Sequence, residues 1–137
     1  MTEQLKRWVP ELDPSGEPMY VAADGYTCQN LMPDRLRQVF ADQRRNPKYG
    51  EDDFIHKAYL RLFMPDGPFI WYVSDFDGED TMYGYVINTA TPDFSEEGSF
   101  SLRDLEQLRG YMGLPVERDC HFEPTALFEV REAQQGP

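Results

Sequence analysis

Residues 69–87 read FIWYVSDFDGEDTMYGYVI, and they carry the strongest indication of the fold. Both of its ends are rich in aromatic and β-branched side chains, which favour extended strands. Between them stands Asp77-Gly78, a pair typical of a tight turn between two strands. The stretch therefore predicts antiparallel strands at 69–76 and 81–87, joined by a two-residue hairpin turn.

The segments on either side extend this hairpin. Residues 55–63 have a period of two in their side chains, which predicts a preceding strand, and residues 65–68 (Pro-Asp-Gly-Pro) have the composition of a turn. Pro33 fits the first position of one helix, where its missing N–H is not needed. Ser101 fits the N-cap of a second helix. A last short strand is expected at 117–122.

These elements predict an α+β fold: an antiparallel sheet of about four or five strands in a meander, with two main helices on one face. The chain has 137 residues, enough for one domain with one core. We expect this single domain at 31–130. Residues 1–30 predict an N-terminal arm that is partly irregular, because prolines and glycines gather at 10–18. Residues 131–137 predict a frayed tail.

Charge is distributed unevenly along the chain. Residues 62–102 contain no lysine or arginine, but they contain eight carboxylates and nine large aromatic side chains. Carboxylates are too costly to bury unpaired, so we expect an ordered acidic surface over an aromatic core. The net charge of −12 repels phosphates and attracts basic partners or cations. Direct binding of nucleic acid is therefore not expected.

Other features bear on location. No part of the sequence approaches about eighteen consecutive apolar residues, so no membrane span is expected. The N-terminal residues lack the apolar stretch of a secretory signal. Cys28 and Cys120 stand alone, fit no zinc-binding spacing, and are expected as free thiols in a reducing compartment. Together these features predict a cytoplasmic protein.

The carboxylates of residues 62–102 are candidate partner contacts. Hard cations take several carboxylate oxygens, but the spacing at 75–80 is out of register for an EF-hand loop. A solvated turn is the plainer interpretation, and a weak metal site or a protein contact stay open. Aromatic side chains on the neighbouring strands fit a packed core or an interface anchor. The candidate contacts are Asp75, Asp77, Glu79, Asp80, Asp93, Glu96 and Glu97, and the candidate anchors are Trp71 and Tyr83.

Histidines and carboxylates offer a second candidate site. If 117–122 is a strand, Glu117, Asp119 and His121 share one face of it. His56 on a neighbouring strand could join them, which would give a small-ligand or metal-dependent enzyme. The sequence has no serine nucleophile motif, no phosphate-binding glycine loop and no paired CxxC. No cofactor is expected.

The same segment also has a purely structural interpretation. Arg118 lies among acidic residues and is expected to form an ion pair with Asp104 or Glu106 of the second helix. Cys120 then points to the face opposite its histidine neighbour, because adjacent residues of a strand alternate.

Two blocks of the chain resemble a known family. The first is residues 69–80 with Tyr-Gly-Tyr-Val at 83–86. The second is Gly-Ser-Phe-Ser-Leu-Arg-Asp-Leu-Glu at 98–106, followed by Leu-Arg-Gly, Gly-Leu-Pro, Glu-Arg-Asp and His-Phe up to residue 122. In order and spacing they are similar to the DUF2958 family of uncharacterised bacterial, plasmid and phage proteins, over residues 31–128. The chain departs from the family pattern in its N-terminal thirty residues and at 43–53.

The resemblance implies an accessory protein of a mobile genetic element and no established activity, cofactor or catalytic residue. Combined with the charge distribution, it favours a non-enzymatic acidic binding protein. The concrete hypothesis is an anti-defence inhibitor, anti-CRISPR or anti-restriction, that mimics nucleic acid and occupies the basic groove of a nucleic-acid-binding host protein or complex. Two alternatives stay open: the enzyme centred on His56 and His121, and a structural or scaffold subunit that self-associates.

Overall fold

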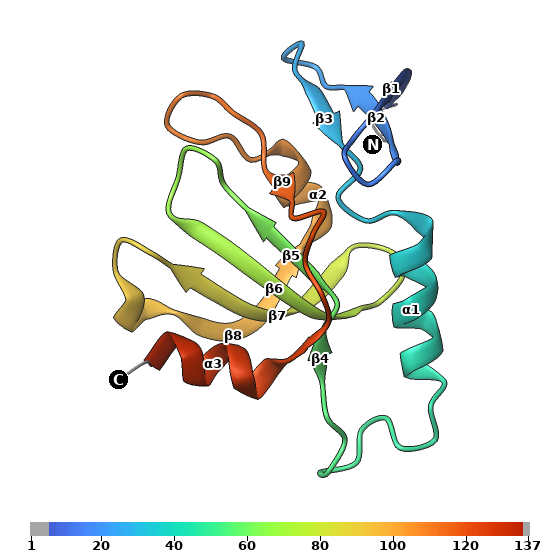
Figure 1. Ribbon diagram of the computed structural model, residues 1–137, viewed down its shortest axis with the longest axis vertical. Helices are drawn as coiled ribbons and strands as arrows, with labels where there is room; N and C mark the ends of the chain where they lie inside the picture. Colours follow the sequence, from blue (N-terminus) through green and yellow to red (C-terminus); the bar gives the residue numbers. More distant parts are fainter. Residues whose placement is uncertain (1–5, 136–137) are drawn as a thin grey trace.

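The computed structural model describes residues 6–135. Its centre is a five-stranded sheet with the order β8-β7-β6-β5-β9, in which every neighbouring pair is antiparallel (Figure 1). The chain runs from β5 to β8 through neighbouring strands, so the expected meander and α+β class are confirmed. The strands are β5 (Leu60–Phe63), β6 (Phe69–Phe76), β7 (Thr81–Asn88), β8 (Glu96–Ser101) and β9 (Glu117–Arg118).

The β6–β7 hairpin is confirmed, but its turn is longer than expected. Phe76 pairs with Met82, and residues 77–80 connect the two strands. The Asp77 carboxylate accepts hydrogen bonds from the N–H groups of Glu79 and Asp80, both at 2.8 Å. Gly78 has φ +89°, a conformation that favours glycine. Because the Asp77 carboxylate accepts hydrogen bonds from amides within the connection, it stabilises this longer connection in place of a two-residue turn.

The expected strand at 55–63 is broken in two. β4 (Lys57–Ala58) pairs with β10 (Thr125–Ala126) in a separate two-stranded sheet, and only β5 belongs to the central sheet. The period of two was present in the sequence, but it does not say which partner each half pairs with. The strand expected at 117–122 is likewise shorter, since β9 has two residues.

The two expected helices lie on one face of the sheet, as predicted. They are α1 (Asp34–Arg44) and α2 (Leu102–Gln107). Leu36 and Phe40 of α1 and Leu102 and Leu105 of α2 belong to one buried cluster with the β6 side chain Trp71. The expected cap of α2 is also confirmed, because Ser101 Oγ accepts the Asp104 N–H at 3.2 Å.

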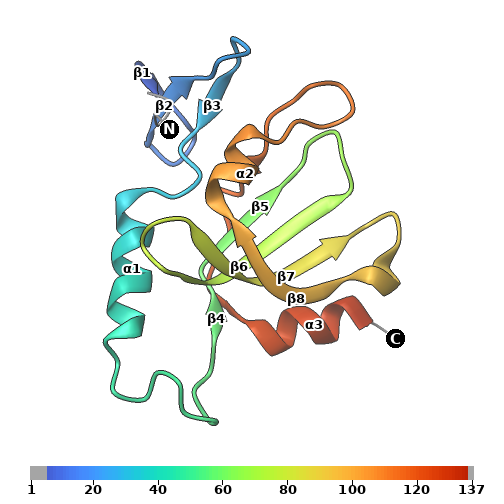
Figure 2. The same ribbon diagram turned by 180° about the vertical axis from the view of Figure 1, so that it is seen from behind.

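A third helix covers the opposite face. α3 (Leu127–Gln135) packs Leu127 and Val130 against Tyr85 and Ile87 of β7, in a second buried cluster (Figure 2). The frayed tail expected at 131–137 is therefore wrong for 131–135, which are helical; residues 136–137 lie outside the described range. Burial of two apolar residues one turn apart stabilises a helix that its own polar composition leaves marginal.

The N-terminal residues are more regular than expected. β1 (Arg7–Leu12), β2 (Pro18–Val21) and β3 (Thr27–Gln29) form a three-stranded antiparallel sheet, which lies above α1 in Figure 1. Only the connections between these strands are irregular. Because β3 has only three residues and β1 contains an irregularity, neither gives a clear alternating pattern in the sequence. The prolines and glycines at 10–18 therefore favour an irregular arm in the sequence-based prediction.

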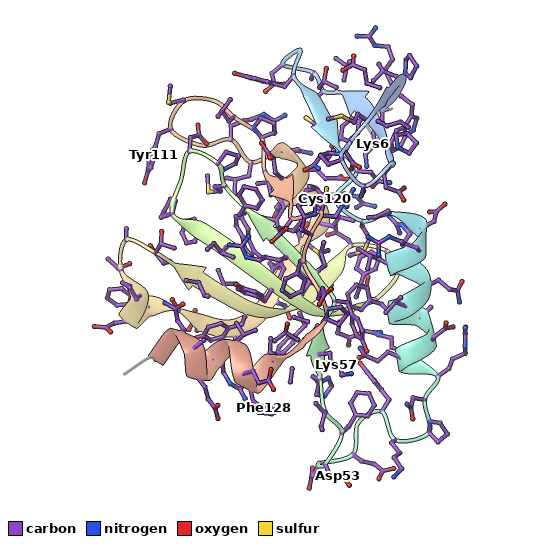
Figure 3. All side chains as sticks on the ribbon, in the orientation of Figure 1. Lys6, Asp53, Lys57, Tyr111, Cys120 and Phe128 are labelled. Carbon is purple, nitrogen blue, oxygen red and sulfur yellow. The ribbon has the colours of Figure 1, made fainter. Side chains whose placement is uncertain are left out.

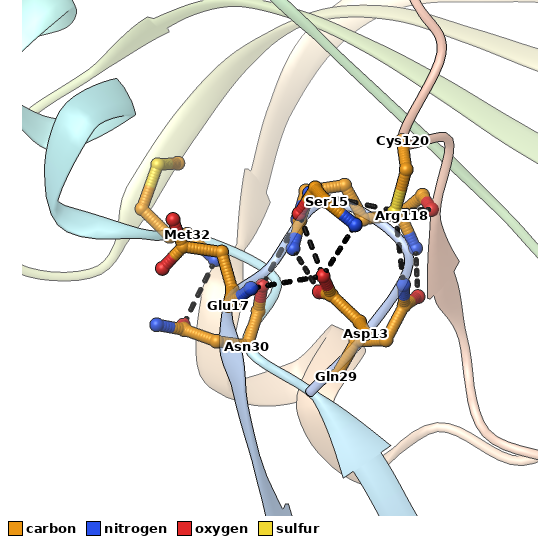
Figure 4. Close-up of polar contacts among 8 residues, drawn as sticks. All are labelled: Asp13, Ser15, Glu17, Gln29, Asn30, Met32, Arg118 and Cys120. Atoms are coloured by element: carbon orange, nitrogen blue, oxygen red, sulfur yellow. Dashed lines mark hydrogen bonds and ion pairs between the residues drawn. The ribbon is translucent and has the colours of Figure 1, made fainter. Parts of the chain in front are cut away.

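A buried ion pair joins this small sheet to the central sheet (Figure 4). Asp13 and Arg118 pair with side chains that are 0% and 1% exposed, so the expected pairing of Arg118 with Asp104 or Glu106 is wrong. Burial raises the pKa of Asp13, but hydrogen bonds from the Ser15 hydroxyl and the Glu17 N–H, with the charge of Arg118, lower it below its usual value.

Two further observations concern sequence expectations. Within residues 6–135, none of the helices combines the length and hydrophobicity needed to cross a bilayer. Cys28 and Cys120 are both free thiols; Cys28 is buried and Cys120 partly buried. Burial raises the pKa of Cys28, which makes this thiol less reactive at neutral pH.

A candidate binding cleft on the α3 face

The candidate acidic contacts do not form one surface. Asp77 and Glu79 lie in the β6–β7 turn, whereas Glu96 begins β8 opposite Val86, and Asp93 precedes it in a short 3₁₀ helix after β7. The stretch of β7 from Thr81 to Val86 separates the two groups by about 17 Å. All four side chains are exposed. Hydrogen bonds from backbone N–H groups, that of Glu79 foremost, lower the pKa of Asp77, so it is ionised at neutral pH.

Asp75 contradicts the expectation of an exposed carboxylate. It is 8% exposed and forms a two-pronged ion pair with Arg44, with N–O distances of 3.0 and 3.1 Å. The Tyr49 hydroxyl also donates to it, as does the Phe76 N–H at 2.9 Å. This carboxylate therefore fixes the end of α1 and the following loop to the sheet, and the protein's own arginine neutralises it.

A β-bulge at Ser74 explains the orientation of Asp75. The register of β6 and β7 shifts between Val73 and Asp75, and Ser74 Oγ donates to the Tyr83 carbonyl at 3.2 Å. The extra residue moves Asp75 to the face that carries α3, opposite Tyr83. Trp71, on the other face, is 5% exposed and belongs to the core, so its role as an exposed anchor is wrong.

Two more candidate contacts have structural partners. Asp80 accepts a hydrogen bond from Ser101 Oγ at 2.7 Å and one from the Arg103 N–H at 2.9 Å, so it stabilises the start of α2. Glu97 accepts from the Tyr83 hydroxyl at 3.0 Å and forms an ion pair with Arg131 of α3. Tyr83 itself is 40% exposed and stays a possible contact.

Asp75, Tyr83 and Glu97 share a cleft that the sequence did not predict. It has a volume of about 560 Å³ and lies between α3 and the segment before β4. Figure 3 labels Asp53 in that segment and Phe128 on α3. The lining residues are Asp52, Asp53, Phe54, Ile55, His56, Asp75, Tyr83, Glu97, Leu127, Phe128 and Arg131.

The cleft combines apolar walls with an acidic rim. Ile55 is 58% exposed and Phe128 is 45% exposed, although both are large apolar side chains. Asp52 and Asp53 are exposed, and within the described residues neither of them forms an ion pair. The lining cation, Arg131, is already paired. The free charge at the cleft is therefore negative.

The residues of the enzyme hypothesis do not converge. His56 lines the cleft and stacks edge-on against Phe54, with ring centroids 5.0 Å apart. His121 follows β9 in a turn, where its N–H bonds Asp119, and Asp119 pairs with Arg61. Glu117 lines a different, smaller cavity of about 190 Å³. In the part of the chain that the structure describes, no group of three or more His, Cys, Asp or Glu side chains could hold a metal.

A second surface feature is a rigid loop after α2. Arg109 and Pro115 bridge its two ends, and the Asp66 carboxylate accepts the N–H groups of Met112 and Leu114 at 2.6 and 3.2 Å. Tyr111, at the outer end of the loop in Figure 3, is 85% exposed and Met112 is 79% exposed. The sequence carried no signal for this feature, because the aspartate lies more than forty residues before the loop.

The comparisons with known proteins identify a family and nothing closer. No curated protein and no solved structure matches the chain. A family model matches residues 31–133, which include the five-stranded sheet and most of the three helices and leave out the N-terminal sheet. The resemblance noted at residues 31–128 is thereby confirmed. The chain belongs to the family described as "Protein of unknown function (DUF2958)".

Proposed function

We propose that this protein is a non-enzymatic acidic binding protein that engages a positively charged surface of another protein. In its more specific form, the proposal is an anti-defence inhibitor of a mobile genetic element, acting in the host cytoplasm. It would occupy a groove that DNA or RNA uses in a CRISPR or restriction complex. Exposed carboxylates would take the place of phosphates, since both present negatively charged oxygens to arginine and lysine.

The observation that carries the proposal is the set of carboxylates without a structural role. The chain has 25 acidic and 13 basic side chains, and seven ion pairs within residues 6–135 use more than half of the basic ones. Many carboxylates are left exposed on rigid elements. The side chains of Glu79, Asp93 and Glu96 are exposed, and their carboxylates accept no hydrogen bond from the described residues. Such charges speed and orient association with a basic partner.

The enzyme alternative has less support, because His56 and His121 lie in different parts of the surface. The scaffold alternative draws on the exposed Tyr111 and Met112, which resemble the centre of an interface. That feature fits any protein partner and does not favour self-association. Charge therefore remains the better guide to the partner.

The test is displacement of nucleic acid. Purified restriction and CRISPR effector complexes are loaded with fluorescent DNA or RNA, and anisotropy is measured as this protein is added. We expect the wild type to displace the oligonucleotide from at least one complex, with an affinity that falls steeply with salt. The triple variant Glu79→Lys, Asp93→Lys, Glu96→Lys should lose this ability, because its altered side chains are exposed and leave the fold intact.

A matched control has the same change of charge elsewhere. Glu11→Lys, Glu123→Lys, Glu132→Lys alters three exposed side chains outside the two acidic groups. It should displace as the wild type does. Equal affinity of the wild type and the first triple variant would reject mimicry by these residues. Asp77 and Asp80 are unsuitable for charge reversal, since both carboxylates accept hydrogen bonds from backbone amides.

A further inference from the structure

We infer that the cleft between α3 and residues 52–56 binds a partner segment in which an arginine or lysine stands next to an apolar side chain. This inference rests on the proposed function, since it names the part of a basic partner that is recognised and the place where it binds. It concerns a site that the sequence did not indicate.

Charge complementarity is the first argument. Asp52 and Asp53 are exposed at the rim of the cleft, in a segment that follows another exposed carboxylate, Glu51. The two arginines near the cleft, Arg44 and Arg131, are already held by Asp75 and Glu97. A cationic side chain would therefore meet free carboxylates and no free arginine. An acidic segment or a nucleic acid would be repelled.

The apolar walls are the second argument. Phe128 and Ile55 expose about half of their side chains to water on the two sides of the cleft. Covering them removes apolar surface from water, which purely charged ligands cannot do. Tyr83 and Phe54 add ring faces, which attract a guanidinium or ammonium group. A segment with both features uses the whole cleft.

The framework of the cleft is held in place before binding. Arg44 and Tyr49 both bond Asp75 and fix the loop that leads to residues 52–56. On the other side, the ion pair of Arg131 with Glu97 fixes α3 to β8. A preformed site loses less conformational entropy on binding than a mobile one. The cleft is large enough, at about 560 Å³, for several side chains.

The experiment is a titration of the ¹⁵N-labelled full chain with three short peptides, followed by amide chemical shifts. The peptides repeat Arg-Leu-Gly, Arg-Ser-Gly or Glu-Leu-Gly. We expect the Arg-Leu-Gly peptide to shift the amides of 52–56, of Glu97 and of α3. The Arg-Ser-Gly peptide should bind at least about fivefold more weakly, because it covers no apolar wall. The Glu-Leu-Gly peptide should leave the spectrum unchanged.

Two double variants test whether the Arg-Leu-Gly peptide binds in the cleft. Asp53→Lys, Phe128→Ser alters the cleft, and Glu11→Lys, Leu12→Ser reverses one exposed carboxylate and removes one exposed apolar side chain on β1, at the opposite end of the molecule from Asp53 (Figure 3). The cleft variant should weaken the Arg-Leu-Gly peptide at least about tenfold, and the control less than about twofold. Unchanged thermal midpoints verify that both fold.

The possible failures are distinguishable. If the Arg-Leu-Gly peptide shifts only the amides near Asp77, Asp93 or Glu96, the cleft inference is overturned and binding of a basic partner stands. If both variants lose affinity equally, the cleft is likewise not the site. If no basic peptide shifts any amide at low salt, the cleft inference and the proposed function fall together.

Discussion

Replacing Asp13 with alanine tests how the N-terminal sheet is attached. The substitution removes the counter-charge of Arg118, whose side chain is 1% exposed. It also removes the acceptor for the Ser15 N–H at 2.8 Å and for the Glu17 N–H at 3.1 Å. The guanidinium would keep two oxygen acceptors, the Asn30 carbonyl at 3.0 Å and the Ser15 hydroxyl at 3.1 Å, and the Cys120 sulfur at 3.7 Å.

The expected cost follows from these contacts. Breaking a buried ion pair by removing one partner costs about 3–5 kcal/mol, because the other charge stays buried. The two oxygen acceptors that Arg118 retains place the loss in the lower part of that range, at about 3–4 kcal/mol. For a domain of this size that corresponds to a decrease of roughly 10 °C in the melting temperature.

Hydrogen exchange followed by mass spectrometry locates the effect, and urea titration gives its size. In Asp13→Ala we expect faster exchange at 7–29, while β6 and β7 stay protected, because the ion pair joins the small sheet to the central sheet. Asp24→Ala is the matched control. It removes an ion pair that joins the same small sheet to Arg109 of the loop after α2, but the Asp24 side chain is 40% exposed. Its cost should be much smaller, because water screens an exposed ion pair.

Two results would contradict this role of the ion pair: similar losses of stability in the two variants, or a loss below about 1 kcal/mol in Asp13→Ala. Either result would mean that burial of the pair between Asp13 and Arg118 has no energetic consequence. Faster exchange in β6 and β7 together with 7–29 would instead mean that the two sheets unfold as one unit.

Ser101→Ala removes the N-cap acceptor of α2 and should lower the unfolding free energy in urea by about 1–2 kcal/mol; an unchanged midpoint would contradict the cap. Gly84→Ala places a Cβ 1.8 Å from the Tyr72 carbonyl oxygen, whereas a Cβ at its strand partner Gly98 meets no atom. Gly84→Ala should therefore lower the melting temperature, and Gly98→Ala should not. The folded-state pKa of Asp13 lies below its unfolded value, so its stabilisation is present above about pH 4 and is lost as the pH falls through the folded-state pKa. Asp13→Asn should flatten this acid dependence in pH-dependent urea titrations, and an unaltered slope would assign it to other carboxylates.

Elements that depend on neighbouring residues along the chain could be predicted from the amino-acid sequence. The β6–β7 hairpin follows from two β-prone runs around Asp77-Gly78, and the start of α2 follows from a serine three residues before an available N–H. The helices on one face follow from leucines at helical spacing. Family membership could also be predicted from the sequence, because it depends on the order of local motifs.

Which charged side chains are unpaired depends on tertiary packing and could not be predicted from the sequence. Asp75 and Arg118 look like ordinary charged residues in the sequence, but each is buried against a partner that lies 31 or 105 positions away. The cleft arises from α3, the 52–56 segment and a one-residue bulge at Ser74. Pairings between residues so far apart in the sequence depend on how sheets and helices pack in space. The periodicity of side chains along the sequence does not reveal them.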